Sequence, residues 1–123
     1  MNLIDSSAWV AYFLKAKTAG YFTKAIEEKS QRIVPSIVIY EVFKTLFSYF
    51  DEKECLLAIA FMKEGIVVDL NIEIALRAAE FSRKLKLGMA DSIIFATADL
   101  YEAVIWTQDV DFKGLKRVRY YKK

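Results

Sequence analysis

Acidic residues stand in four separate segments of the sequence, each at a position where a carboxylate could do chemistry. Asp5 follows a short apolar segment, and Glu41 lies within an apolar and aromatic one. Asp91 opens a long apolar stretch. Asp109 follows another apolar segment, and Asp111 stands two residues further on. Gathered carboxylates repel one another and are costly to bury unpaired, so a bound divalent cation would relieve both penalties.

The residue types that are missing narrow this chemistry. The chain has no histidine and one cysteine, Cys55, which excludes His-based triads, His-ligated zinc and multi-cysteine metal sites. An all-oxygen set of ligands favours a hard cation, Mg²⁺ or Mn²⁺. Such a centre typically serves phosphate chemistry, because the metal activates a water and neutralises charge on a phosphodiester.

Each acid also has a purely structural interpretation. Asp5 and Asp91 are both followed by a serine and a helical pattern, so either could be an N-cap. Glu41 could pair with Lys44 three residues on, which is worth only a few tenths of a kcal/mol. Asp109 and the acid that follows it could form Asx turns. These interpretations leave the clustering of acids in four segments unexplained.

The elements that must position these acids can be read from the apolar pattern. We expect strands near 2–5, 32–34, 66–69 and 103–106, and a fifth at an edge near 118–120. We expect helices near 8–14, 18–29, 37–47, 51–62, 72–85 and 91–102, with Ser36, Asp51 and Asn71 as N-caps. Short apolar strands separated by helices predict one α/β domain over residues 1–123. It would be a three-layer α/β/α sandwich around a mainly parallel sheet of four to five strands. Ligands bind at the carboxyl ends of the strands in such folds.

The length of 123 residues and the hydrophobic content of 55% are sufficient for one packed core. The start of the chain lacks a basic segment followed by a long apolar one, and no apolar run approaches about 18 residues. We therefore expect a cytoplasmic protein.

Basic residues gather in two places. Arg83, Lys84 and Lys86 stand just upstream of an acid of the candidate site, and six basic residues without an acid occupy 113–123. Arg117 and Arg119 of that tail, with the upstream cluster, are candidates for contacts with RNA phosphates. The alternative is a solubilising tail.

The sequence resembles the PIN-domain ribonucleases, and among them the short VapC toxins of toxin–antitoxin pairs. The resemblance runs over nearly the whole chain and rests on four segments in order: Leu3-Ile4-Asp5-Ser6-Ser7-Ala8-Trp9, Val34-Pro35-Ser36-Ile37-Val38-Ile39-Tyr40-Glu41-Val42, Ala90-Asp91-Ser92-Ile93-Ile94-Phe95-Ala96-Thr97-Ala98 and Trp106-Thr107-Gln108-Asp109-Val110-Asp111-Phe112.

The resemblance implies roles for individual residues. Asp5, Glu41, Asp91 and Asp109 match the family's acidic quartet, which holds Mg²⁺ or Mn²⁺ and a water nucleophile. Asp111 matches an accessory acid, and Ser6 and Thr107 match hydroxyl positions that support the quartet. It also implies cleavage of RNA, a homodimer, and an antitoxin protein that blocks the site. Many toxin members carry arginine soon after the glutamate, where this chain has Lys44.

Two alternatives remain. The first is a PIN nuclease of RNA processing or quality control that has no antitoxin. The second is a Mg²⁺-binding signalling module of receiver type, which uses a similar sandwich. A receiver needs an acidic pair after the first strand and a lysine after a late strand, whereas Asp5 is followed by Ser6-Ser7 and Trp106 by Thr107-Gln108.

Overall fold

Five parallel strands form a single central sheet in the computed structural model, which describes all residues 1–123. The strands are β1 (Asn2–Ile4), β2 (Arg32–Pro35), β3 (Ile66–Val68), β4 (Val104–Thr107) and β5 (Val118–Tyr120), and their order across the sheet is β3-β2-β1-β4-β5. Every neighbouring pair is parallel. This confirms the predicted α/β sandwich, and β5 lies at an edge as its charge suggested.

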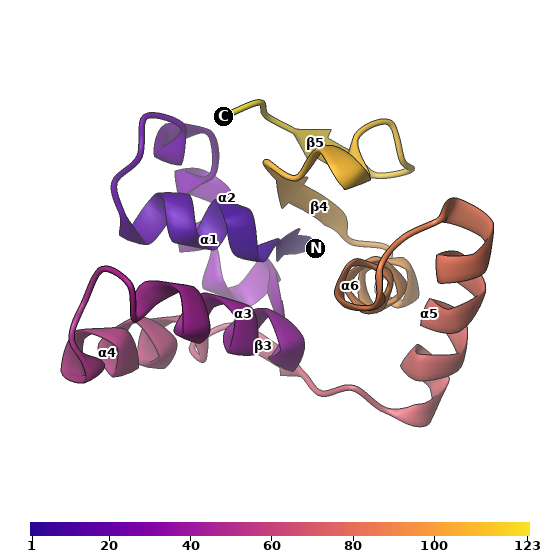
Figure 1. Cartoon of the computed structure of the whole chain (residues 1–123), viewed down its shortest axis with the longest axis horizontal. Coiled ribbons are helices and arrows are strands. Elements are labelled where there is room, and N and C mark those ends of the chain that lie inside the picture. Colours follow the sequence, from indigo (N-terminus) through magenta and orange to yellow (C-terminus); the bar gives the residue numbers. More distant parts are fainter.

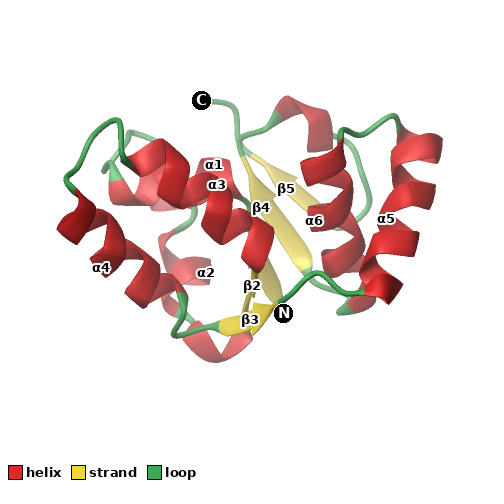
Figure 2. Cartoon of the chain, turned by 60° about the horizontal axis from the view of Figure 1, so that its bottom comes forward, coloured by secondary structure: helices red, strands yellow, loops and turns green.

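Six α-helices cover the sheet: α1 (Ser6–Phe13), α2 (Thr23–Glu27), α3 (Ser36–Leu46), α4 (Glu52–Met62), α5 (Ile72–Leu85) and α6 (Met89–Leu100). Helices α1 to α4 gather on one side of the sheet, and α5 and α6 pack together on the other (Figures 1 and 2). The strand order reverses between β1 and β4, because the chain runs outward to β3 and returns through α5 and α6 to the other side of β1. A reversal of this kind opens a crevice at the carboxyl ends of the central strands. No helix combines the length and the apolarity needed to cross a membrane.

Two of the predicted N-caps are confirmed by their hydrogen bonds. Asp51 Oδ1 accepts a hydrogen bond from Glu54 N at 2.8 Å, and Asn71 Oδ1 accepts one from Ile74 N at 2.9 Å. The prediction for Ser36 is wrong, because α3 already begins at that residue and Pro35, whose φ of −64° suits a helix entry, occupies the cap position. Both confirmed caps satisfy backbone N–H groups that the first helical turn leaves unpaired.

The predicted helix over 18–29 is divided in the structure. Only Thr23–Glu27 is α-helical, between 3₁₀ turns at Ala19–Tyr21 (η1) and Lys29–Gln31 (η2). Glu28 ends the helix with a non-helical backbone at φ −83° and ψ 73°. The apolar residues of this segment do share one face, but the chain must turn at once into β2, and this connection limits the helix to a little over one turn.

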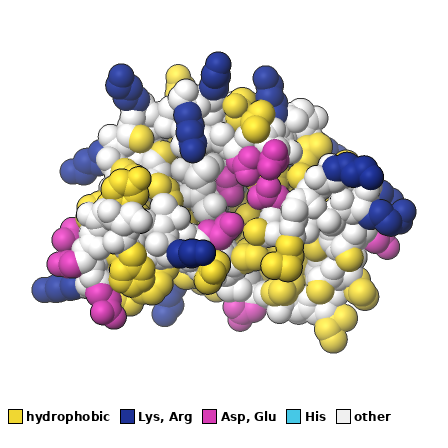
Figure 3. Space-filling model, in the orientation of Figure 1, with side chains coloured by type: hydrophobic (Ala, Val, Ile, Leu, Met, Phe, Trp, Pro, Cys, Tyr) yellow, Lys and Arg dark blue, Asp and Glu magenta, His cyan; other side chains and the backbone are white.

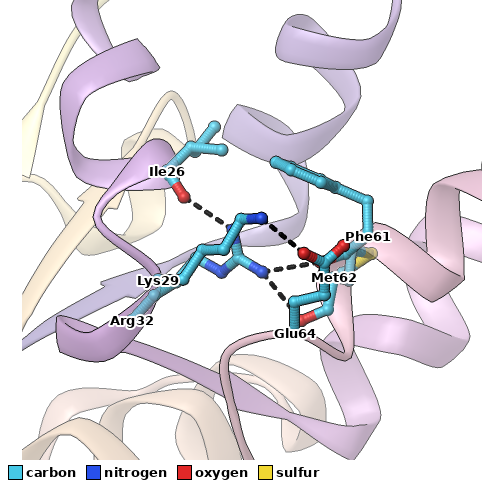
Figure 4. Close-up of polar contacts among 6 residues, drawn as sticks. All are labelled: Ile26, Lys29, Arg32, Phe61, Met62 and Glu64. Carbon is cyan, nitrogen blue, oxygen red and sulfur yellow. Dashed lines mark hydrogen bonds and ion pairs between the residues drawn. The ribbon is translucent and has the colours of Figure 1, made fainter.

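A buried arginine at the start of β2 joins the ends of two helices (Figure 4). The Arg32 guanidinium donates to the carbonyl oxygen of Ile26 at 2.6 Å, and to those of Phe61 and Met62 at 2.7 and 3.1 Å. It also lies over the rings of Trp9 and Phe61, at 5.0 and 4.9 Å from their centroids. Carbonyl groups at the end of a helix carry partial negative charge, so this cation holds α2 and α4 against the sheet without a carboxylate partner.

Candidate metal centre

Asp5 leaves the end of β1 and turns into the molecule, where only 2% of its surface is exposed. Its Oδ2 accepts hydrogen bonds from Ser7 Oγ at 2.8 Å and from Thr107 Oγ1 at 2.7 Å, whereas Ser6 Oγ lies 3.4 Å from Oδ1. Burial raises the pKa of this carboxyl above its ordinary value, against the lowering effect of these hydrogen bonds. Asp5 does occupy the N-cap position of α1, but its side chain makes no cap hydrogen bond to the helix and is bound by hydroxyl groups instead.

The loop after β4 is tied to the loop after β1 through two hydroxyl groups. Thr107 Oγ1 accepts a hydrogen bond from Asp109 N at 2.8 Å while it donates to Asp5. Ser7 Oγ accepts one from Gln108 N at 2.9 Å. The strand pairing of Ile4 with Trp106 brings the two loops together. Thr107 therefore takes up the supporting position that the resemblance implied.

Ser7, rather than Ser6, makes the shorter of the two serine hydrogen bonds to Asp5. Sequence reasoning missed Ser7 and Gln108 as parts of the site. Both stand beside residues that the resemblance did mark, but nothing in the sequence says which of two adjacent serines points toward a carboxylate. That direction depends on how the start of α1 lies against the end of β4.

Three carboxylates meet at the start of α6. One oxygen from each of Asp91, Asp109 and Asp111 lies within 4.8 Å of the other two. Asp109 Oδ1 also accepts a hydrogen bond from Asp111 N at 2.9 Å, so the predicted Asx turn and the acidic cluster occur together. Helix α6 begins at Met89, two residues before the predicted start, and Gly88 takes the cap position. Asp91 is thus in the first turn, where it is not an N-cap.

The pKa of Asp91 is raised to about 7, chiefly by burial and then by the negative charges of the surrounding acids, of which Asp109 acts most strongly. A carboxyl group in this position keeps its proton near neutral pH unless a cation replaces the proton. Perturbed carboxyls of this kind cluster at functional sites.

Glu41 projects from the middle of α3 toward the same acids. Its Oε1 is buried and has no hydrogen-bond partner. Burial is the main cause that raises its pKa, with smaller contributions from the charges of Asp5 and Asp109. The alternative pairing with Lys44 is not present, because the Lys44 ammonium lies over the Tyr40 ring, 5.8 Å from its centroid. An unpaired buried carboxylate oxygen indicates a site built for a cationic or proton-donating ligand.

The four acids of the quartet line one cavity of about 450 Å³ at the carboxyl ends of β1 and β4. The acids come from four different elements, and Asp111 lies beside them. Acidic side chains gather near the middle of the face drawn in Figure 3, with lysine and arginine side chains toward its rim. The donors are all carboxylate oxygens. Burial raises the pKa values of Asp5, Glu41 and Asp91, and the charges of neighbouring carboxylates raise them further. This set fits a hard divalent cation held by Asp91, Asp109 and Asp111, with Asp5 and Glu41 beside it.

The basic residues predicted to contact RNA are divided between two edges of the sheet. Arg83, Lys84 and Lys86 are exposed at the end of α5, immediately before the helix that carries Asp91. Arg119 lies on β5 with its guanidinium 5.2 Å from the Trp106 ring centroid. Arg117 precedes β5 and is bound to Asp99 at 2.9 Å near the last turn of α6, far from the acidic cavity. The structure thus places Arg117 away from the acids, and its contact with RNA phosphates stays a prediction.

The last two lysines of the chain line the acidic cavity instead. Lys122 and Lys123 follow β5, and the bond from Tyr121 N to Thr107 O at 2.9 Å carries this segment to the carboxyl edge. Sequence reasoning noted the basic tail but did not single out these two residues. The position of these lysines follows from the parallel direction of β5. Residues before a parallel strand lie at the amino edge of the sheet, and residues after it lie at the carboxyl edge.

Several solved structures have this fold. A toxin–antitoxin complex from Klebsiella pneumoniae matches with a TM-score of 0.84 and 24% identity, over 100% of both chains. VapC20 of Mycobacterium tuberculosis, a toxin that cleaves the sarcin–ricin loop, matches with a TM-score of 0.78 and 18% identity, over 97% of this chain and 99% of that one. VapBC2 of Rickettsia felis, bound to a fragment of promoter DNA, matches with a TM-score of 0.73 and 14% identity, over 98% and 97%.

No curated protein matches the sequence closely. The family model described as the PIN domain matches residues 3–118, which include every acid of the cavity. Sequence and fold agree over almost the whole chain, and the protein belongs to the PIN domain family.

Proposed function

We propose that this protein is an endoribonuclease that depends on Mg²⁺ or Mn²⁺ and hydrolyses phosphodiester bonds in RNA. The observation that carries the proposal is the convergence of Asp5, Glu41, Asp91 and Asp109 from four elements on one cavity. Membership of the PIN domain family supports the same chemistry. The chain has no histidine, and four of the titratable side chains that line the cavity are carboxylates.

Each acid has a part in the proposed reaction. Asp91, Asp109 and Asp111 would hold the cation, which when bound would neutralise charge on the phosphate and lower the pKa of a water. Asp5, held by Ser7 and Thr107, would keep its carboxylate at a fixed place in the cavity. Glu41 carries the free buried oxygen and a raised pKa, so we assign it the acceptance of a proton from the attacking water.

Asp5→Asn and Asp91→Asn test this assignment. We expect the wild type to cleave structured RNA in Mg²⁺ or Mn²⁺ but not in EDTA, and each variant to lose activity by about 10²-fold or more. Asp69→Asn is the matched control, because Asp69 also follows a strand at the carboxyl edge but is exposed and does not line the cavity. Gel analysis of the products is the measurement. Cleavage that survives both substitutions would show that the acids are not the active site.

We also propose that the enzyme is the toxin of a toxin–antitoxin pair. Solved structures of the same fold from Klebsiella pneumoniae and Rickettsia felis are complexes of this kind. A hairpin with the sarcin–ricin sequence is a reasonable first substrate, because VapC20 is a toxin that cleaves that loop. Expression of the wild type should arrest bacterial growth, and Asp91→Asn should not. Normal growth with an active enzyme would favour the alternative, a PIN nuclease of RNA processing that has no antitoxin.

A homodimer is part of the proposal. Tyr40 on α3 and Phe47 just after that helix are exposed, and Ile72 and Leu76 are exposed on α5. Large apolar side chains exposed on outer helices are candidates for a protein contact. Sedimentation should give the mass of two chains, and Leu76→Lys should shift it toward one. A wild type that sediments as one chain at high concentration would contradict this part.

A further inference from the structure

A second cavity of about 490 Å³ adjoins the acidic one. The two cavities share four lining residues: Ser6, Ser7, Gln108 and Lys123. The shared residues form the wall between the cation site and a groove that runs along α1 to the end of α3. A ligand that occupied both cavities would pass directly over this wall.

The side chains that line the second cavity differ in charge from those that line the acidic cavity. No carboxylate lines it, and two lysines, Lys17 and Lys123, do. Val10 of α1 and Leu14 just after it supply an apolar side, and Thr45 supplies a hydroxyl group from α3. An apolar surface with a few hydrogen-bonding groups and nearby positive charge suits an aromatic base attached to a phosphate.

Tyr49 completes this lining at the turn after α3. It is 61% exposed, and no aromatic partner covers its ring. An exposed tyrosine beside lysines can stack on an unpaired base, because every base presents a flat π face. The nearby side chain of Gln108 is held by donation from Nε2 to Ser7 O at 3.3 Å, while its buried Oε1 has no partner.

We propose that this cavity binds the nucleoside next to the scissile phosphate, with its base stacked on Tyr49 and its phosphate near Lys17 and Lys123. The inference rests on the proposed function, because it places the scissile phosphate in the acidic cavity. The groove between α1 and α3 would then determine which base the enzyme prefers beside the cleaved bond. Single-stranded RNA is the ligand, since a paired base could not unstack onto the ring.

Tyr49→Ala tests the proposal, with Tyr101→Ala as the matched control. Tyr101 is also exposed, at 40%, but lines a different cavity near Asp99 and Arg117. Binding is measured by fluorescence anisotropy in EDTA with a labelled eight-nucleotide RNA of random sequence, so that no cleavage occurs. Tyr49→Ala should raise the Kd by about 5- to 150-fold, because stacking on one aromatic side chain contributes about 1–3 kcal/mol. Tyr49→Phe should bind as the wild type does, and Lys17→Ala should weaken binding.

The same variants are then compared in Mn²⁺ on a pool of random RNA, and the cleaved ends are sequenced. Tyr49→Ala should change the preferred base beside the cut and raise KM more than it lowers kcat. Tyr49→Ala that binds and cuts like Tyr101→Ala would overturn the proposal, as would a wild type that does not bind the RNA. A wild type that binds through Tyr49 but cuts no RNA would instead contradict the proposed nuclease activity and leave the nucleoside site standing.

Discussion

At the scale of single residues, Thr107 is the side chain that holds two of the acids in place. Its hydroxyl donates to Asp5, accepts from Asp109 N, and lies 3.4 Å from Ser7 Oγ. One buried oxygen thereby fixes a carboxylate from β1 and the backbone that presents another after β4. Removal of this hydroxyl leaves Asp109 N without its acceptor and the buried Asp5 carboxylate with one donor fewer, which costs more than the net value of the bonds.

Thr107→Val should therefore lower stability by about 1–3 kcal/mol and weaken Mg²⁺ binding. Thr107→Ser should retain both properties. Thr97→Val is the control, because Thr97 is equally buried but donates only to Ile93 O within α6. Urea unfolding and calorimetric titration with Mg²⁺ are the measurements. Equal Mg²⁺ affinity in Thr107→Val and Thr97→Val would show that Thr107 does not position the acids.

The pKa of Asp91 predicts how stability depends on pH in the absence of metal. This carboxyl has a pKa of about 7 in the folded protein and an ordinary value of 3.8. The folded state therefore binds more protons than the unfolded state between these values, and stability falls as pH rises through that window. In EDTA, the Tm should decline from pH 5 to pH 8, and less so in Asp91→Asn. Mg²⁺ should raise the Tm by more at pH 8 than at pH 5, because fewer protons compete with the cation for the carboxylate oxygens at pH 8. Parallel curves for wild type and variant would contradict the assigned pKa.

At the scale of elements, the buried Arg32 determines how closely α2, α4 and β2 approach one another. Gly65, just before β3, leaves room for it. A Cβ at this position would lie 2.8 Å from both Arg32 Nε and Arg32 O. The backbone oxygen of Arg32 cannot move without a shift of β2. The loop after α4 can therefore lie this close to Arg32 only if residue 65 has no side chain.

Gly65→Ala should thus lower the free energy of unfolding by about 1–3 kcal/mol, the usual cost of an overpacked site. Gly20→Ala is the control, because its Cβ would meet nothing within 4 Å. The metal site lies at the opposite edge of the sheet, so the Mg²⁺ affinity of folded Gly65→Ala should equal that of the wild type. Chemical denaturation and Mg²⁺ titration give the two values. A neutral Gly65→Ala would mean that Arg32 can leave its buried position at little cost.

At the scale of the whole molecule, charge is distributed so that a cavity of acids is bordered by cations. The formal net charge is only +2, yet Lys122 and Lys123 of the basic tail line the acidic cavity itself. A polyanion brought near these acids would be repelled without such cations. Under the proposed function, the tail would favour the approach of RNA, and a bound cation would favour the reaction.

Replacement of Lys122 and Lys123 by alanine should weaken RNA binding at low salt and reduce its salt dependence. For each phosphate that the protein no longer neutralises, the slope of log K against log salt should fall by about 0.7 for a single strand. A double replacement of Lys63 and Lys116 removes equal charge far from the cavity and should leave the slope unchanged. Anisotropy over a range of NaCl concentrations gives the slopes. Equal slopes in the two double variants would show that the tail does not contact the RNA.

The sequence by itself determined the α/β class, the strand-end positions of Asp5 and Asp109 and the caps at Asp51 and Asn71, because these follow from local patterns. It also identified the acids that share the cavity, through motifs in a set order. Only the tertiary structure decided that Ser7 makes the shorter bond to Asp5 and that Thr107 joins two loops. It likewise brought Lys122 and Lys123 to the acids and left Arg117 at Asp99. The first two outcomes depend on the register of β4 against β1, which joins residues about a hundred positions apart. The other two depend on the parallel direction of β5 against β4.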